Sequence, residues 1–239
     1  MITNEFHRNP VYIYCVRHSH NQTFQKQREK KMSKNSISTL SLLILLLIFT
    51  SSYAGSGGEV NRQSDSRPEI GDPAPDFQGM TDQGDVWSSA DYEGQTLVVF
   101  FFPAAMTGGC TAQACSFRDN RTQLIEMGAE VVGISGDQIS NLQLFRRTNN
   151  LNFPLVADSD GSIARAFGVP VRDGGTITRE IDGEEVTLTR DVTTARWTFI
   201  IDEDGKIAYV DTEVDASVDS EAVLAAIKKM KSDDGLGRP

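Results

Sequence analysis

Short, largely apolar runs mark the strands that we expect at the centre of the fold. Three such runs lie at 96–102, 130–134 and 154–157. A run that is apolar at nearly every position is typical of a strand buried on both faces of a sheet. We expect helices between and after these strands, over about 107–127, from Ile139 to Phe145, over 162–167 and over 222–230.

Three hairpins complete the predicted fold, and the turn of each contains an Asp and a Gly, which favour tight turns. The hairpins span 77–87, 174–195 and 197–210, with turns at 82–84, 182–183 and 204–205. Strands that alternate with helices, followed by a terminal hairpin and helix, predict an α/β sandwich. Its central sheet is mixed and flanked by helices, and the first hairpin lies at the N-terminal end of the domain.

A basic flank, an apolar run and two small residues precede this pattern. Three lysines between residues 30 and 34 come before Leu40–Phe49, a run too short to span a bilayer comfortably. Small residues follow at 52 and 54. This order is typical of a secretory signal peptide, so we expect cleavage after Ala54 and export to the periplasm or out of the cell. An uncleaved anchor is the alternative, and Met32, rather than Met1, would be a natural start for the signal.

Removal of residues 1–54 changes the charge and the available chemistry. The whole chain has 23 basic and 33 acidic residues, and seven of the former and two of the latter lie in 1–54. The remainder has a net charge of −15, which disfavours nucleic acid and anionic lipid as partners. We divide it into a Gly/Ser-rich flexible leader at 55–68, one domain at 69–231 and a loose polar tail at 232–239.

The exported part of the chain retains two cysteines, Cys110 and Cys115, and no histidine. A structural zinc site needs four ligands, usually Cys or His. Two cysteines are too few for such a site within one chain. The lack of histidine also excludes a catalytic Cys–His pair and a copper site of the Cys/His type. We therefore expect no metal site of these kinds.

A permanent disulfide between these two cysteines is disfavoured by their spacing. In an unbroken α-helix, Cα atoms five residues apart are separated by roughly 8.6 Å, whereas a disulfide needs less than about 7 Å. If the helix begins before Cys110, the bond requires the first turn to unwind. Such a bond suits a redox switch better than a structural link, because strained disulfides are easily reduced.

Cys110 is predicted to lie in the first turn of a helix that follows a buried strand. The helix dipole and the unpaired N–H groups there favour a thiolate. Thr107 is either the N-cap residue or a hydroxyl that serves the thiolate or a bound oxygen. Pro103 either ends the strand or forms a wall that shields the thiol. The glycines at 108 and 109 allow close approach of the backbone.

The stretch Pro103-x-x-x-Thr107-x-x-Cys110 resembles the peroxidatic-cysteine motif of peroxiredoxins. With Cys115 five residues later, it is similar to the Q subfamily, or bacterioferritin comigratory protein type. The resemblance covers about 69–231. It implies a thioredoxin-like fold, a peroxidase without a cofactor, and a role for Arg196 in holding the thiolate and polarising the peroxide.

The resemblance implies that peroxide oxidises Cys110 to a sulfenic acid and that Cys115 then forms a disulfide with it. A thioredoxin-like dithiol protein then reduces that disulfide. Family members are monomers or dimers, so we expect a monomer or a weak homodimer. The hairpin at 174–195 is longer than the family leads us to expect, and it is placed to reshape the entrance of the site or a docking face.

Two other functions remain open from the sequence. The first is an exported disulfide reductase or isomerase with the same fold, although such enzymes usually carry Cys-x-x-Cys. The second is a binding module with an inert disulfide. Residues 158–161 begin like a calcium loop but lack the later acidic ligands, so we interpret them as a turn and helix cap.

Overall fold

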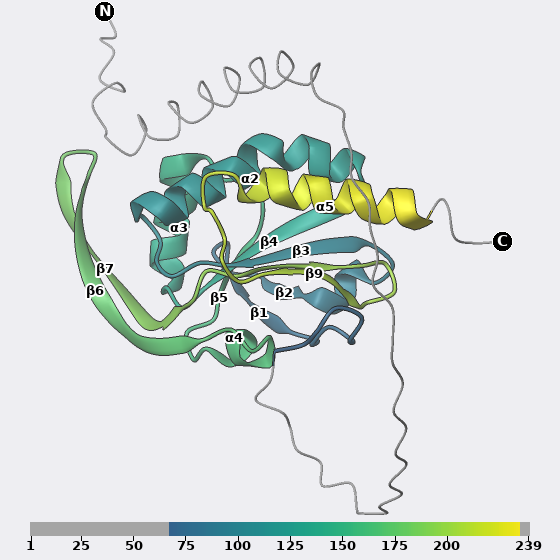
Figure 1. Ribbon diagram of the computed structural model, residues 1–239. Helices are drawn as coiled ribbons and strands as arrows, with labels where there is room; N and C mark the ends of the chain where they lie inside the picture. The colour runs from purple at the N-terminus through teal and green to yellow at the C-terminus, as the bar shows by residue number, and fades with distance from the viewer. Residues whose placement is uncertain (1–66, 235–239) are drawn as a thin grey trace, which may run out of the picture.

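The computed structural model describes residues 67–234 (Figure 1). The predicted signal peptide and most of the predicted leader lie outside the described residues. The strands are β1 (Gln78–Thr81), β2 (Val86–Ser88), β3 (Thr96–Phe101), β4 (Ala129–Ser135), β5 (Leu155–Ala157), β6 (Val171–Ile181), β7 (Glu184–Thr194), β8 (Thr198–Ile201) and β9 (Ile207–Asp211). The helices are η1 (Ser89–Tyr92), α2 (Gly108–Glu126), α3 (Ile139–Asn149), α4 (Ser162–Ala166) and α5 (Asp219–Asp234).

Seven of the strands form one mixed sheet in the order β2-β1-β5-β4-β3-β8-β9. β4 runs parallel to both β3 and β5, and the other neighbours are antiparallel. All six residues of β3 are buried, as the apolar run predicts. The α/β sandwich with a mixed sheet flanked by helices is thus confirmed, together with the N-terminal hairpin of β1 and β2.

Two hydrophobic clusters cover the two faces of the sheet. Alternate residues of β3 point to opposite faces, as strand geometry requires. Val98 and Phe100 join the cluster beneath α2, α3 and α5, and Val99 and Phe101 join the cluster beside α4. Figure 1 shows the three long helices on one side of the sheet and α4 on the other. α2 therefore starts at the carboxyl end of a central strand and packs on the larger cluster.

The hairpin of β6 and β7 forms a separate two-stranded sheet that curves away from the body and past α3 (Figure 1). It is nevertheless part of the core, because Ile181 and Leu188 are buried in the same cluster as Cys110. The Asn141 side chain of α3 also donates a hydrogen bond to the carbonyl of Thr189 at 2.7 Å. The hairpin is longer than predicted, since it begins at Val171.

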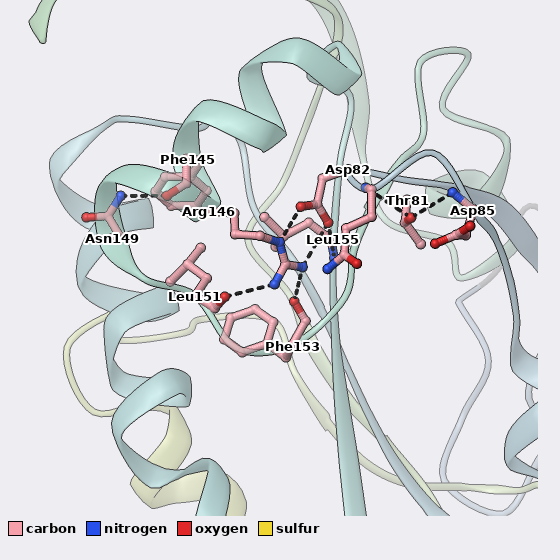
Figure 2. A network of polar contacts seen from close by, with 10 residues as sticks. Thr81, Asp82, Asp85, Phe145, Arg146, Asn149, Leu151, Phe153 and Leu155 are labelled. Atoms are coloured by element: carbon pink, nitrogen blue, oxygen red, sulfur yellow. Dashed lines mark hydrogen bonds and ion pairs between the residues drawn. The ribbon is translucent and has the colours of Figure 1, made fainter.

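A partly buried ion pair joins the β1–β2 turn to the C-terminal end of α3 (Figure 2). The Arg146 guanidinium binds both carboxylate oxygens of Asp82 and donates to the carbonyls of Leu151 and Phe153. The Leu155 N–H donates to Asp82 at 3.3 Å. One arginine thus ties the β1–β2 turn to the end of α3 and to the loop that leads from α3 to β5.

Two predictions about the chain ends are modified. α5 begins at Asp219 and continues to Asp234, so it is longer than the predicted 222–230 and includes the first residues of the predicted tail. α5 starts earlier than predicted because its first residues make side-chain contacts with α2, which no pattern along the chain reveals.

Within residues 67–234, no helix has the length and apolar character needed to span a membrane.

Candidate active site

Cys110 lies in the first turn of α2, directly after the loop that leaves β3. Its side chain is only 1% exposed, and its thiol is free in this structure. The backbone beside it is open, because Gly108 and Gly109 are exposed. The first N–H groups of a helix have no partner within the helix, so they favour a negative charge at this position.

Arg196 supplies the positive charge of the site. It lies between β7 and β8, and the pairing of β8 with β3 brings it next to the start of α2. Its Nη2 lies 3.3 Å from the Sγ of Cys110. A Cβ atom on Gly109 would lie 3.2 Å from the same nitrogen, so a glycine there leaves room for the guanidinium. The cation and the helix start thus both lie beside the sulfur of Cys110.

A buried chain of hydrogen bonds continues behind Arg196. Its Nη1 donates to the Oε1 of Gln113 at 2.6 Å, and the Nε2 of Gln113 donates to the Oδ2 of Asp219 at 2.6 Å. The Thr198 hydroxyl donates to the same oxygen at 2.8 Å. Burial raises the pKa of Asp219 to about 6, although the bonds from Gln113 and Thr198 oppose that shift.

Thr107 and Pro103 lie in the loop before Cys110, as predicted. Thr107 occupies the N-cap position, but its hydroxyl makes no capping bond. It donates instead to the carbonyl of Ala104 at 2.8 Å, which leaves its lone pairs to accept from another group. Pro103 is half-buried and follows the end of β3. The structure therefore disfavours a simple capping role for Thr107.

The backbone of the same loop is held from two sides. The Ala105 N–H donates to the buried Asp137 carboxylate at 2.7 Å. Met106 has a φ of 60°, which is unusual for a residue with a side chain. Its carbonyl accepts a bond from the Nε of Arg179, on the β6–β7 hairpin, at 3.3 Å. The long hairpin thus reaches the loop that carries the candidate site.

Cys115 is buried one and a half turns further along α2, and its Sγ lies 4.0 Å from the Oδ1 of Asn149 on α3. α2 is continuous through both cysteines, since it begins at Gly108. The condition stated from the sequence is therefore met: a bond between Cys110 and Cys115 requires the first turn to unwind.

Sequence reasoning identified Cys110 and Arg196, which the structure brings into contact, but it missed Gln113 and Asp219. Gln113 had a detectable signal, because a polar residue three positions after Cys110 lies on the same face of the helix. Asp219 had none, since it is more than a hundred residues away. Within residues 67–234, no group of three or more His, Cys, Asp or Glu side chains is arranged to hold a metal ion.

Comparison of the sequence with known proteins identifies a family that matches most of the described chain. The sequence profile of the AhpC/TSA family matches residues 70–210. Peroxiredoxin Bcp of Escherichia coli is 36% identical over 161 residues, which cover 67% of this chain and 96% of that protein.

Two solved structures are similar to the fold. Peroxidoxin BcpB of Mycobacterium tuberculosis is 31% identical, with a TM-score of 0.57 over 68% of this chain and 98% of that one. The bacterioferritin comigratory protein of Xanthomonas campestris, studied for its alkyl peroxide reduction activity, is 26% identical. Its TM-score is 0.53 over 64% of this chain and 91% of that one.

Proposed function

This chain belongs to the AhpC/TSA family as a peroxiredoxin of the Bcp/PrxQ type, and we propose that Cys110 is its peroxidatic cysteine and Cys115 its resolving cysteine. The observation that carries the proposal is the contact of 3.3 Å between the Arg196 guanidinium and the Cys110 thiol at the start of α2. A buried thiol with a cation on one side and helix N–H groups on the other is suited to react as a thiolate.

In the first step, the Cys110 thiolate attacks one oxygen of the peroxide, and the O–O bond breaks. The sulfur is oxidised by two electrons to a sulfenic acid, and the leaving oxygen takes a proton to form water or an alcohol. Arg196 and the helix N–H groups stabilise the negative charge that develops on that oxygen. The lone pairs of the Thr107 hydroxyl accept a hydrogen bond from the incoming peroxide.

In the second step, the first turn of α2 unwinds and the Cys115 thiol condenses with the sulfenic acid. A disulfide forms and one water molecule leaves. This step needs a local rearrangement because the helix is continuous between the two cysteines. Gly108 and Gly109, which are exposed, serve as the hinge. A dithiol protein then reduces the disulfide by exchange.

The proposal also covers the substrates, the reductant and the location of this cycle, and the location rests on the signal-like segment that ends at Ala54. We assign hydrogen peroxide and organic hydroperoxides as substrates, a thioredoxin-like dithiol protein as reductant, and an exported location. The relative from Xanthomonas campestris supports the organic peroxides. A monomer or weak homodimer remains the expected oligomeric state.

The test follows the intact mass of the full chain with Cys15→Ser, which leaves only Cys110 and Cys115. The protein is reduced, freed of excess thiol and mixed with one equivalent of hydrogen peroxide. We expect a rapid loss of two hydrogen atoms in this chain. A further Cys115→Ser change should give instead the gain of one oxygen atom, because the sulfenic acid has no partner.

The control for that experiment is Cys15→Ser with Cys110→Ser, which should not react rapidly. Oxidation of Cys110 no faster than that of a free thiol in solution contradicts the peroxidase mechanism. Normal turnover of the Cys115→Ser chain with thioredoxin contradicts only the resolving role. Insulin reduction without peroxide consumption would favour the alternative, an exported disulfide reductase or isomerase.

A further inference from the structure

We propose that Gln113 and Asp219 are positioning residues for Arg196, which hold its guanidinium against the Cys110 thiol. The inference rests on the proposed role of Cys110 and extends it to α5, a helix outside the motif. It starts from three side chains in one line: Arg196 to Gln113 at 2.6 Å, and Gln113 to Asp219 at 2.6 Å. Gln113 is fully buried and Asp219 is 2% exposed, so water does not compete for these bonds.

The donors and acceptors in this line allow only one arrangement. A guanidinium can only donate, so the oxygen of the Gln113 amide must face Arg196 and its NH₂ group must face Asp219. The Oδ2 of Asp219 is the acceptor that holds the NH₂ group, and the Thr198 hydroxyl donates to the same oxygen. Asp219 therefore determines which end of the Gln113 amide points to the arginine.

Loss of this acceptor has a definite consequence at the thiol. Without Asp219, the NH₂ group of Gln113 loses its acceptor, so the amide oxygen is no longer held in place against Arg196. The guanidinium then moves away from a position that also serves Cys110, because one nitrogen contacts Gln113 and the other contacts Sγ. The thiolate loses the cation that stabilises it.

The experiment compares Asp219→Ala with the parent chain, both as the full chain with Cys15→Ser. Two quantities are measured: the second-order rate constant of Cys110 with hydrogen peroxide, and the pH profile of Cys110 alkylation by iodoacetamide. We expect the peroxide rate constant to fall about tenfold, as for the loss of one hydrogen bond to a charged group. The alkylation profile should shift to higher pH, because the thiolate is less favoured.

Three further variants make the result specific. Gln113→Leu has a similar volume without the polar ends, and it should reproduce both effects even if Asp219→Ala fails to fold. Asp219→Asn keeps an acceptor for Gln113 and should stay close to the parent. Ser220→Ala is the matched control, since Ser220 is equally buried at the same helix start but bonds to Ser116 and Asn120 instead.

The outcomes separate this inference from the proposed function. An unchanged alkylation profile in both Asp219→Ala and Gln113→Leu overturns the inference. An equal shift in Ser220→Ala overturns it too, because the cause would then be general packing of α5. If the parent chain does not react rapidly with peroxide, the peroxidase mechanism fails, and the alkylation profiles still decide whether Asp219 positions Arg196.

Discussion

At the scale of single residues, Asp219 combines two properties that are costly together, a carboxylate and nearly complete burial. The groups that face it are Gln113 and Arg196 on one side, and Thr198 and Asp211 on neighbouring strands. Its Oδ1 has no hydrogen-bond partner within the described residues. Burial therefore dominates, and the pKa of Asp219 rises from 3.8 to about 6.

This raised pKa predicts how stability depends on pH. Between pH 3.8 and about 6 the folded state binds more protons at Asp219 than the unfolded state, so stability falls as pH rises. The cost is absent below the lower value and complete above the higher one. It amounts to about 3 kcal/mol for a shift of this size.

Urea unfolding of the parent and Asp219→Asn at several pH values from 4 to 7 measures this effect. The free energy of unfolding of the parent, relative to Asp219→Asn, should fall as pH rises through this range. Parallel curves for the two proteins would show that Asp219 ionises as easily in the folded state as in the unfolded one.

At the scale of elements, the long hairpin is held at its base by close backbone contact with the end of β4. The Asp191 N–H donates to the carbonyl of Gly136 at 3.0 Å. A Cβ atom on Gly136 would lie 2.3 Å from the carbonyl oxygen of Val192, and backbone cannot move aside as a flexible side chain can. Only glycine fits at this crossing.

Gly136→Ala should therefore destabilise the protein by about 1–3 kcal/mol, as overpacking does. Gly175→Ala is the matched control, because a Cβ atom there meets its nearest neighbour at an ordinary 3.5 Å. Thermal unfolding measures both variants. An equal effect of the two changes would mean that the hairpin base adjusts freely.

The elements themselves were largely predictable, and the reason is local. Runs such as β3 are apolar at nearly every position, and Asp-Gly turns separate the paired strands. The turn and helix cap at 158–161 is confirmed, because the Asp158 carboxylate accepts the N–H groups of Ile163 and Ala164. The start of α5 was missed because its first residues are defined by contacts with α2, not by an apolar pattern.

At the scale of the whole molecule, the Asp82–Arg146 pair joins the β1–β2 turn to the end of α3, 64 residues further along the chain (Figure 2). The Asp82 side chain is 1% exposed, and Arg146 supplies its charge partner. If that partner is removed, a buried carboxylate remains without a counter-charge. Such losses are larger than those of surface ion pairs.

Arg146→Ala should thus lower the free energy of unfolding by about 3–5 kcal/mol. Arg147→Ala, at the next and exposed position, should change it by less than about 0.5 kcal/mol. Urea unfolding at neutral pH measures the difference. A loss for Arg146→Ala no larger than for Arg147→Ala would show that the pair contributes little.

Local patterns along the chain predict the strands, the helices and the two cysteines that we propose as reactive, because each depends on neighbours in the sequence. Apolar runs define the strands, and the helix start defines the environment of Cys110. The resemblance of that segment to a known motif added Arg196, which is 86 residues away. A contact between residues so far apart in the sequence cannot be inferred from their spacing along the chain.

The surroundings of the Cys110 thiol, in contrast, follow from the three-dimensional packing of the chain. It placed Arg196 against Cys110, directed the Thr107 hydroxyl to a backbone carbonyl, and brought Asp219 behind Gln113. It also showed that the long hairpin shares a core with the site. The physical reason is the same in each case: hydrogen-bond partners and packing neighbours are chosen by the folded backbone, which brings together residues that no local pattern connects.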